Sequence, residues 1–193
     1  MLLDAAFDLL GTQGWTATTV RAVCQRARLN PRYFYESFTT LDELLIALYD
    51  RLVAEAQQVA LDAVAGAPDD PLARTRATLG ALFRFVVDDP RRARVLFVEA
   101  HGNEGMMRRR LDTMLAMADQ LDAYARQVYG EPRPGERISQ VAANVLVAGA
   151  SELLVAWLDG HLDMTLDELV EDAAALFTAT GEAAIAIAVA RRH

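Results

Sequence analysis

Residues 15–38 read WTATTVRAVCQRARLNPRYFYESF, a stretch with the pattern of two short helices joined by a tight turn. The apolar stripe of the first helix repeats at i, i+3, i+4 and i+7, through Val20, Val23, Cys24 and Ala27. Thr18 or Thr19 stands where a side-chain oxygen caps the first turn, so a helix is predicted over about 19–27. After Arg28 and Leu29 comes Asn30-Pro31, a cap residue followed by the residue best suited to open a second helix.

The second helix has two different faces. Phe34 and Phe38 lie at i and i+4 on one face. Arg32, Tyr33 and Glu36 turn to another side. The first face is predicted to join the core, and the second is free to meet a partner. Two helices around a turn, with arginine and aromatic residues on the free face of the second, are typical of a helix-turn-helix motif that reads DNA.

Positive charge is concentrated in the same stretch of a chain that is acidic overall. The chain has 19 basic and 27 acidic residues, for a formal net charge of −8. Between Thr19 and Tyr35 there is no acidic residue, and the cations are Arg21, Arg26, Arg28 and Arg32. Residues 1–51 contain five Arg and six Asp or Glu, a net charge of −1, and the remainder carries −7. The N-terminal quarter is therefore the part that tolerates a phosphate backbone.

From residue 2 to residue 48 the order of segments resembles the DNA-binding domain of the TetR family of transcriptional regulators. The matching segments are LLDAAFDLLGTQGW, TATTVRAVCQRARLN and PRYFYESFTTLDELL, which are specific only together. The residues that the resemblance places on DNA are Thr19, Arg21, Asn30, Arg32, Tyr33, Tyr35 and Thr40. Arg32 and Tyr33 are expected in the groove. Tyr35 and Thr40 are expected at phosphates, where contacts position the protein without reading sequence.

Two features depart from the family pattern. Arg28 stands where the family usually has a turn glycine, which raises a question about the geometry of the turn. The chain also starts at its first helix, without the basic N-terminal arm common in relatives, which raises a question about affinity.

Simpler roles exist for several of these side chains. Tyr33 and Tyr35 could be half-buried aromatic residues of a helix. Arg21 could be a solvated charge, and Arg32 could pair with Glu36 at i, i+4. These alternatives remain open from the sequence.

The composition indicates a folded protein of a reducing compartment. The chain has 193 residues, 53% of them hydrophobic, enough for one large or two small domains with a filled core. Its single cysteine, Cys24, lies on an apolar stripe, so a buried thiol and a cytoplasmic location are expected. The first helix lacks the zones of a signal peptide. Residues 141–158 and 173–190 are apolar but interrupted by polar residues, so helices packed on both sides are expected rather than membrane spans.

Glycine and proline breakers cut the chain into helix-length pieces without strand alternation. Helices are predicted at about 41–65, 71–88, 90–101, 104–129, 136–159 and 165–191, the last opened by a capping box from Thr165 to Glu168. With three short helices before them, the predicted fold is all-α with about nine helices. The predicted domains are a helix-turn-helix DNA-binding domain at 1–48 and a helical bundle for ligand binding and dimerisation at 49–193. The last two helices are rich in alanine, and their equivalents in the TetR family form the dimer interface, so a homodimer is expected.

Large and adaptable side chains beyond the motif are typical of a cavity for a small apolar effector. The candidate ligand-binding residues are Phe83, Phe97, His101, Met114, Met117, Tyr124, Asn144 and Trp157. Ordinary core packing is the alternative for any one of them. Two carboxylates among them, Glu99 and Glu152, would need partners if buried. The three histidines have no metal-ligand spacing, and no metal or other cofactor is expected.

The sequence contains no P-loop, no dinucleotide-binding glycine motif and no nucleophile elbow, so an enzyme is not expected. The resemblance implies a ligand-responsive DNA-binding transcriptional regulator, a repressor that a small apolar effector releases from a palindromic operator. The expected partners are double-stranded DNA with an inverted-repeat operator, the effector and a second copy of the chain, with no membrane. Activation rather than repression also fits. The other alternative is a dimeric small-molecule carrier or interaction protein that retains a non-functional helix-turn-helix.

Overall fold

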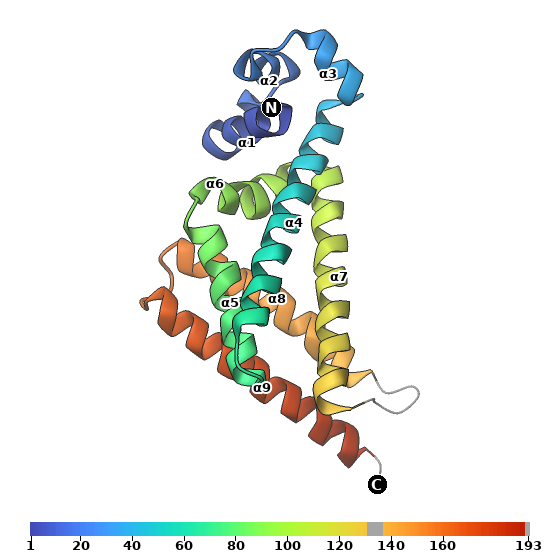
Figure 1. Ribbon diagram of the computed structural model, residues 1–193, viewed down its shortest axis with the longest axis vertical. Helices are drawn as coiled ribbons and strands as arrows, with labels where there is room; N and C mark the ends of the chain where they lie inside the picture. The colour runs from blue at the N-terminus through green and yellow to red at the C-terminus, as the bar shows by residue number, and fades with distance from the viewer. Residues whose placement is uncertain (131–136, 192–193) are drawn as a thin grey trace. The chain divides into compact units, whose positions relative to one another are not determined.

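The computed structural model describes residues 1–130 and 137–191, and every regular element in those residues is helical (Figure 1). The α-helices are α1 (Leu2–Gln13), α2 (Val20–Ala27), α3 (Pro31–Ser37), α4 (Leu41–Gly66), α5 (Pro71–Val87), α6 (Pro90–Ala93), α7 (Glu104–Tyr129), α8 (Ile138–Leu158) and α9 (Leu166–Ala190). Short 3-10 turns lie at Trp15–Ala17 (η1) and Glu99–Gly102 (η3), and a π-helical segment lies at Arg94–Val98 (η2). Within the described ranges the predicted all-α fold is confirmed.

The predicted helix at 90–101 is the element that differs most from the structure, because it is divided into α6, η2 and η3. At the end of η2 the amide of Glu99 donates to the carbonyl oxygen of Arg94, five residues earlier. A π turn is defined by this i to i+5 hydrogen bond. The side chains of the same two residues form an ion pair, with Arg94 Nε 2.8 Å from Glu99 Oε1. The spacing of apolar residues does not reveal an ion pair between Arg94 and Glu99, so the sequence pattern predicted one continuous helix.

The described chain forms two compact units, and α4, α5 and α7 each contribute to both. The first unit consists of Met1–Gln58 with Arg84–Leu111, and the second of Val59–Phe83 with Asp112–His193. The two units are regions in which residues contact mainly one another, and this does not show which part of the chain folds by itself. The predicted domain boundary at residue 48 therefore stays a prediction.

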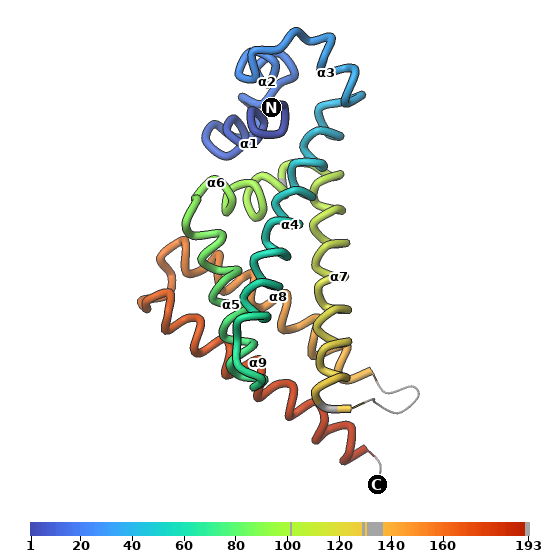
Figure 2. The backbone as a smooth tube through the Cα atoms, in the orientation of Figure 1, coloured from blue at the N-terminus to red at the C-terminus, as the bar shows by residue number. Residues whose placement is uncertain are grey.

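The core of the first unit includes four leucines of α4 and one aromatic residue of α3. The buried leucines are Leu44, Leu45, Leu48 and Leu52. Phe34 of α3 is fully buried. In the same unit α1 packs against α2, and α2 packs against α3 (Figure 2). Burying a large aromatic side chain fixes the rotation of a short helix, and so decides which side of α3 is exposed.

In the second unit α8 and α9 pack against each other. The predicted capping box opens α9: the Thr165 hydroxyl accepts from the amide of Glu168, whose carboxylate accepts from the amide of Thr165. Both helices are long and apolar enough to cross a membrane, which by itself is weak evidence for a membrane protein. Only 17% of each apolar window is buried in the chain. The expectation that these helices are packed on both sides is therefore wrong for a single copy.

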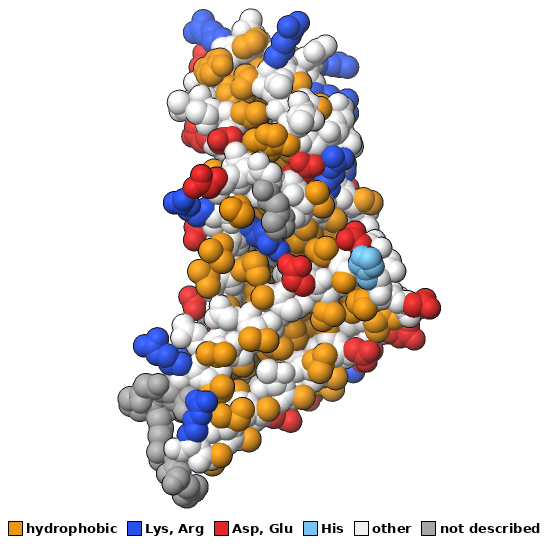
Figure 3. Space-filling model, turned by 180° about the vertical axis from the view of Figure 1, so that it is seen from behind, with side chains coloured by type: hydrophobic (Ala, Val, Ile, Leu, Met, Phe, Trp, Pro, Cys, Tyr) orange, Lys and Arg blue, Asp and Glu red, His pale blue; other side chains and the backbone are white. Residues whose placement is uncertain are grey.

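The exposed surface of this helix pair is rich in apolar side chains, although it also carries Glu171, Asp172 and Glu182 of α9. Its exposed large hydrophobic side chains are Val141, Val145, Leu158, Leu176, Ile187 and Val189. Figure 3 shows apolar side chains gathered in diagonal bands over α8 and α9. Soluble monomers rarely expose contiguous apolar patches larger than a few hundred Å².

Candidate nucleic-acid interface

The helix α2 is short and is held by its N-cap and a buried stripe. The hydroxyl oxygen of Thr19 accepts a 3.1 Å hydrogen bond from the amide of Ala22, which identifies Thr19 as the N-cap. Val23, Cys24 and Ala27 are buried along the predicted stripe. Burial raises the pKa of the Cys24 thiol, so the group stays protonated and packs as a small apolar side chain.

The turn after α2 has the geometry of a glycine turn, although its residue is Arg28. Arg28 has φ 56° and ψ 40°, in the left-handed region that L side chains rarely adopt. Its amide donates to the carbonyl oxygen of Gln25 at 3.2 Å, and the amide of Leu29 donates to that of Cys24 at 2.9 Å. This pair of hydrogen bonds is a Schellman motif, in which glycine usually occupies the left-handed position. The turn is therefore intact with arginine in that position.

The helix α3 depends on its cap and on one buried aromatic side chain. Asn30 Oδ1 accepts from the amide of Arg32 at 2.9 Å, and Pro31 occupies the first helical position, as predicted. The ring of Tyr35 meets buried Phe34 edge to face, with centroids 5.3 Å apart. These contacts orient α3 so that the positions beside Phe34 face outward.

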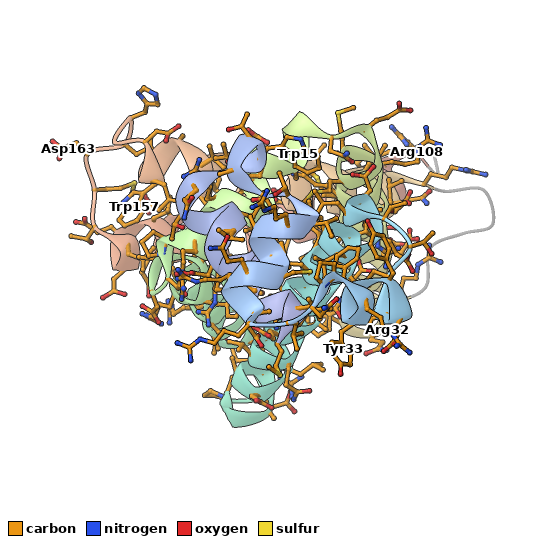
Figure 4. All side chains as sticks on the ribbon, turned by 90° about the horizontal axis from the view of Figure 1, so that it is seen from above. Trp15, Arg32, Tyr33, Arg108, Trp157 and Asp163 are labelled. Carbon is orange, nitrogen blue, oxygen red and sulfur yellow. The ribbon has the colours of Figure 1, made fainter. Side chains whose placement is uncertain are left out.

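Three of the predicted DNA-contacting side chains lie on this outward side. Arg32 is 83% exposed, Tyr33 54% and Tyr35 63%, and Figure 4 shows Arg32 and Tyr33 projecting from α3. Each of the two tyrosines therefore exposes more than half of its surface, and their contact with DNA stays a prediction. Arg32 Nε lies 2.9 Å from Glu36 Oε1, the i, i+4 pair that the sequence allowed. Such exposed pairs contribute only about 0.3–0.5 kcal/mol, so a phosphate or a base edge could displace Glu36.

Thr19, Asn30 and Thr40 each cap the start of a helix. At the start of α4, Thr40 Oγ1 accepts from the amide of Glu43 at 3.1 Å. Each cap uses an oxygen lone pair, which leaves the threonine hydroxyl protons and the Asn30 amide hydrogens as donors. Donors at helix starts are well placed for phosphate oxygens.

The four arginines of the motif differ in their partners. Arg26 pairs with Asp8 of α1, and Arg32 pairs with Glu36. Arg21 and Arg28 are exposed and have no hydrogen bond or ion pair from their side chains to any residue that the structure describes. The predicted local excess of positive charge therefore rests on Arg21 and Arg28.

A buried carboxylate connects η3 with η1. Glu99 is 8% exposed; its Oε2 accepts from the amide of Trp15 at 3.0 Å and its Oε1 from Nε of Arg94 at 2.8 Å. Arg94 also donates to the carbonyl oxygen of Thr12 at 2.9 Å. We call Trp15, Arg94 and Glu99 the Glu99 clamp. The expected need of Glu99 for a partner is confirmed, whereas Trp15 and Arg94 were not predicted as its partners.

A second cluster of charges joins α6 to α1. Arg91 Nη2 lies 2.7 Å from Asp89 Oδ2, its Nη1 lies 3.3 Å from Asp8 Oδ1, and its guanidinium lies 4.6 Å from the ring centroid of Phe7. Asp89 also caps α6 by accepting from the amide of Arg91. The hydrogen bonds from Arg91 hold the pKa of Asp89 below its ordinary value. Arg91 was not selected from the sequence, because Asp8 is 83 residues away along the chain.

An open depression of about 460 Å³ lies beside α3 in the first unit. Its lining residues are Met1, Leu2, Leu3, Leu29, Tyr33, Glu36, Ser37, Phe38 and Arg51. Tyr33 is the one predicted DNA-contacting residue in this lining, and the predicted effector residues are not part of it.

The predicted effector residues are divided between the two units. The second unit contains Phe83, Met114, Met117, Tyr124, Asn144 and Trp157, the first contains Phe97, and the side chain of His101 lies outside the described part of the chain. The Asn144 amide donates to the carbonyl oxygen of Gln140 at 2.8 Å, and the Trp157 indole donates to that of Met164 at 2.7 Å. By contrast, the Tyr124 hydroxyl is buried without a hydrogen-bond partner among the described residues.

The N-terminal part of the chain matches a known protein family. Residues 2–48 match the family model described as bacterial regulatory proteins, tetR family. The match covers the helix-turn-helix and the start of α4, and it confirms the resemblance seen in the sequence. A search of curated proteins found no match to the chain.

Solved structures share the fold over nearly the whole chain at low sequence identity. The fatty acid degradation regulator FadR from Bacillus halodurans has a TM-score of 0.74 and 16% identity, over 91% of this chain and 92% of that one. FadR from Bacillus subtilis, solved in complex with stearoyl-CoA, has a TM-score of 0.72 and 15% identity, over 91% and 95%. A TetR family transcription regulator from Marinobacter aquaeolei has a TM-score of 0.62 and 21% identity, over 94% and 92%. At these identities the likeness shows the fold.

Proposed function

We propose that this protein, which has a tetR-family domain at residues 2–48 and a TetR-like fold, is a DNA-binding transcriptional regulator. In the proposed mechanism it is a cytoplasmic homodimer that represses transcription from an inverted-repeat operator. A small apolar effector binds the second unit and lowers the affinity for that operator.

The observation that carries this proposal is the outward side of α3. Buried Phe34 and the Asn30 cap fix the helix, so Arg32 and Tyr33 are presented on a rigid element. The major groove of DNA is about 12 Å wide and admits one α-helix, and arginine is the commonest side chain for bidentate contact with guanine. Of the predicted DNA contacts, Arg32 and Tyr33 are the ones that would read sequence.

The first experiment is selection of bound duplexes from a random DNA library at low salt, where phosphate contacts are strongest. The wild type should enrich an inverted repeat with half-sites about 34–36 Å apart or a multiple of that spacing. The Arg32→Ala/Tyr33→Ala variant should lose this enrichment with its circular dichroism unchanged. Arg108→Ala is the matched control, because Arg108 is an exposed arginine of α7 paired with Glu104. If the wild type enriches nothing, the proposal fails and the carrier with a non-functional helix-turn-helix is favoured.

The apolar surface of α8 and α9 supports the homodimer. Two copies that meet through this surface would remove exposed valine and leucine side chains from water, at about 25 cal/mol per Å² of apolar area. Val145→Asp/Leu176→Asp should give a monomer in sedimentation velocity and should weaken operator binding, because two half-sites need two recognition helices. Leu61→Asp changes an exposed leucine of α4 and is the control that should stay dimeric. A dimeric double variant would place the interface elsewhere.

The unsatisfied hydroxyl of Tyr124 supports an effector that is apolar but carries a polar atom. A buried hydroxyl without a partner is unfavourable, and a ligand oxygen or nitrogen would satisfy it. Because FadR from Bacillus subtilis was solved with stearoyl-CoA, stearoyl-CoA is the first probe. At a concentration about 100 times its dissociation constant, a ligand stabilises by about 2.7 kcal/mol. For a chain of this size that raises Tm by about 5–11 °C.

Tyr124→Phe distinguishes a role of the Tyr124 hydroxyl in ligand binding from a role in folding. This substitution should leave the Tm of the free protein unchanged or slightly higher, because it removes a buried group without a partner. It should reduce the shift caused by stearoyl-CoA. A wild type whose Tm does not respond to stearoyl-CoA would rule out long-chain acyl-CoA as the effector.

Repression would end through coupling between the effector and DNA. An allosteric coupling of about 1–3 kcal/mol would lower operator affinity by a factor of about 5–150. The helix α4 contributes to both compact units, so its displacement is the proposed route. By thermodynamic reciprocity, saturating operator must weaken effector binding by the same factor. A ligand whose affinity is unchanged by operator would contradict this mechanism.

A further inference from the structure

Arg28 has an unusual backbone conformation. In residues 1–130 and 137–191 it is the one residue other than glycine with a positive φ, at 56°. Left-handed backbone is unfavourable for a residue with a Cβ atom, which is why glycine usually occupies this position of a Schellman motif. When a strained conformation persists in a motif, a role for the side chain beyond folding is the hypothesis to test.

The surroundings of Arg28 give its side chain no structural role. The side chain is exposed and makes no hydrogen bond or ion pair within the described part of the chain. The arginines on either side of it in the sequence differ, because Arg26 pairs with Asp8 and Arg32 pairs with Glu36. Folding therefore does not explain an arginine at this position.

Arg28 lies next to the proposed DNA-reading helix along the chain. It lies in the turn that leads directly into α3, two residues before the Asn30 cap and four before Arg32. The guanidinium group presents five donors in a planar fork that matches phosphate oxygens. With no carboxylate to displace, Arg28 could approach a phosphate without first losing another ion pair.

We propose that Arg28 contacts the phosphate backbone of DNA, and that this contact is the reason for arginine at a glycine turn. The inference rests on the proposed function. Contacts to phosphate carry no sequence information, so Arg28 would raise the affinity for every duplex, while Arg32 and Tyr33 select among sequences.

Three substitutions separate the charge of Arg28 from the strain of its backbone. Arg28→Gly removes the charge and relieves the strain, and should raise Tm by about 2–4 °C. Arg28→Gln removes the charge and keeps the strain, so Tm should stay near that of the wild type. Arg28→Lys keeps both the charge and the strain. A purely structural role would move stability without moving the salt dependence of DNA binding.

Fluorescence anisotropy on the selected operator and on a random duplex, between about 50 and 400 mM KCl, measures that salt dependence. Each phosphate contact contributes about 0.9 to the slope of log affinity against log salt, hence about 1.8 for a dimer. Arg28→Gly and Arg28→Gln should lower the slope by this amount and should weaken both duplexes equally, by about 60-fold at 0.1 M salt. Arg28→Lys should retain most of the slope. Arg108→Gln, which removes the same charge from α7, should keep the full slope.

The outcomes distinguish the inference from the proposed function. Operator binding by the wild type, with an unchanged slope in Arg28→Gln, would overturn the inference and leave the proposed function intact. Weakening confined to the operator would mean that Arg28 reads bases, which also overturns the phosphate contact. A wild type that binds no duplex would overturn both.

Discussion

From the contacts of the Glu99 clamp we predict that truncating Glu99 causes a large loss of stability. Glu99→Ala removes the acceptor of two hydrogen bonds, from the Trp15 amide at 3.0 Å and from Arg94 at 2.8 Å. Removing one partner of a fully buried ion pair costs about 3–5 kcal/mol. The Glu99 side chain is 10% exposed but that of Arg94 is 37% exposed, so water recovers part of the loss. We expect a loss of about 2–3 kcal/mol, which lowers Tm by about 4–12 °C.

Urea unfolding followed by circular dichroism measures this loss through the midpoint and the slope. Glu99→Gln is the matched control, because its amide oxygen can still accept from Trp15 while the charge is gone, and we expect it to cost about 1 kcal/mol. Arg94→Met removes the other partner and keeps the apolar stem. The double variant closes a thermodynamic cycle, in which a coupling energy of about 1–2 kcal/mol is expected.

Two results would refute this reasoning. One is a loss below about 0.5 kcal/mol for Glu99→Ala at an unchanged slope, which would mean that water replaces the carboxylate at no cost. The other is a coupling energy near zero between the two positions, which would mean that Arg94 and Glu99 stabilise the first unit independently.

Three further substitutions test the packing, the charge and a helix cap of the first unit. Gly11→Ala would place a Cβ 2.5 Å from Cβ of Arg91, so α1 must shift from α6. The cost of overpacking, about 1–3 kcal/mol, should exceed the gain in helix propensity and lower the stability, and a Tm above that of the wild type would contradict this. Asp89→Asn should destabilise the protein at pH 5–7, and its deficit relative to the wild type should shrink as the pH falls toward 3. The pKa of Asp89 is lowered in the folded protein, so its charge gives stability that is present above the unfolded pKa and is lost as pH falls through the folded pKa; urea midpoints from pH 3 to 7 check this direction. Asn30→Ala removes the acceptor of the Arg32 amide and should cost about 1 kcal/mol, whereas Asn30→Ser should restore most of it in the same assay.

The helix starts of the motif could be predicted because their signals are local. Thr19 accepts from an amide three residues ahead, and Asn30 from one two residues ahead. The capping box at Thr165 is equally short in range. A pattern within one turn of helix is visible in the sequence, so these elements begin where the sequence indicated.

The clamp could not be predicted because its partners are far apart in the chain. Trp15 and Glu99 are 84 residues apart, and the sequence offered only an acidic residue among apolar ones. The same contact explains why the expected helix at 90–101 is interrupted. Tertiary hydrogen bonds to Glu99 outweigh the local preference for a continuous α-helix.

The candidate effector residues show a different limit of sequence reasoning. Size and polarity selected Trp157 and Asn144, but the same properties suit a residue that packs in a bundle. The structure provides partners for both, Met164 for the indole and Gln140 for the amide. Only the three-dimensional arrangement separates them from Tyr124, whose hydroxyl has no described partner.

The single cysteine of the chain gives the motif a built-in reporter of its own opening. Cys24 is 2% exposed and its thiol has a raised pKa, whereas labelling needs an accessible thiolate that attacks the disulfide of the reagent. Labelling with an aromatic disulfide such as Ellman's reagent must therefore wait until α2 separates from its neighbours. The labelling rate of the unmodified protein would time that local unfolding at one atom, with no engineered probe. Comparing the labelling rate of the free protein with that of the DNA-bound protein would show how much DNA binding suppresses local unfolding of the helix-turn-helix.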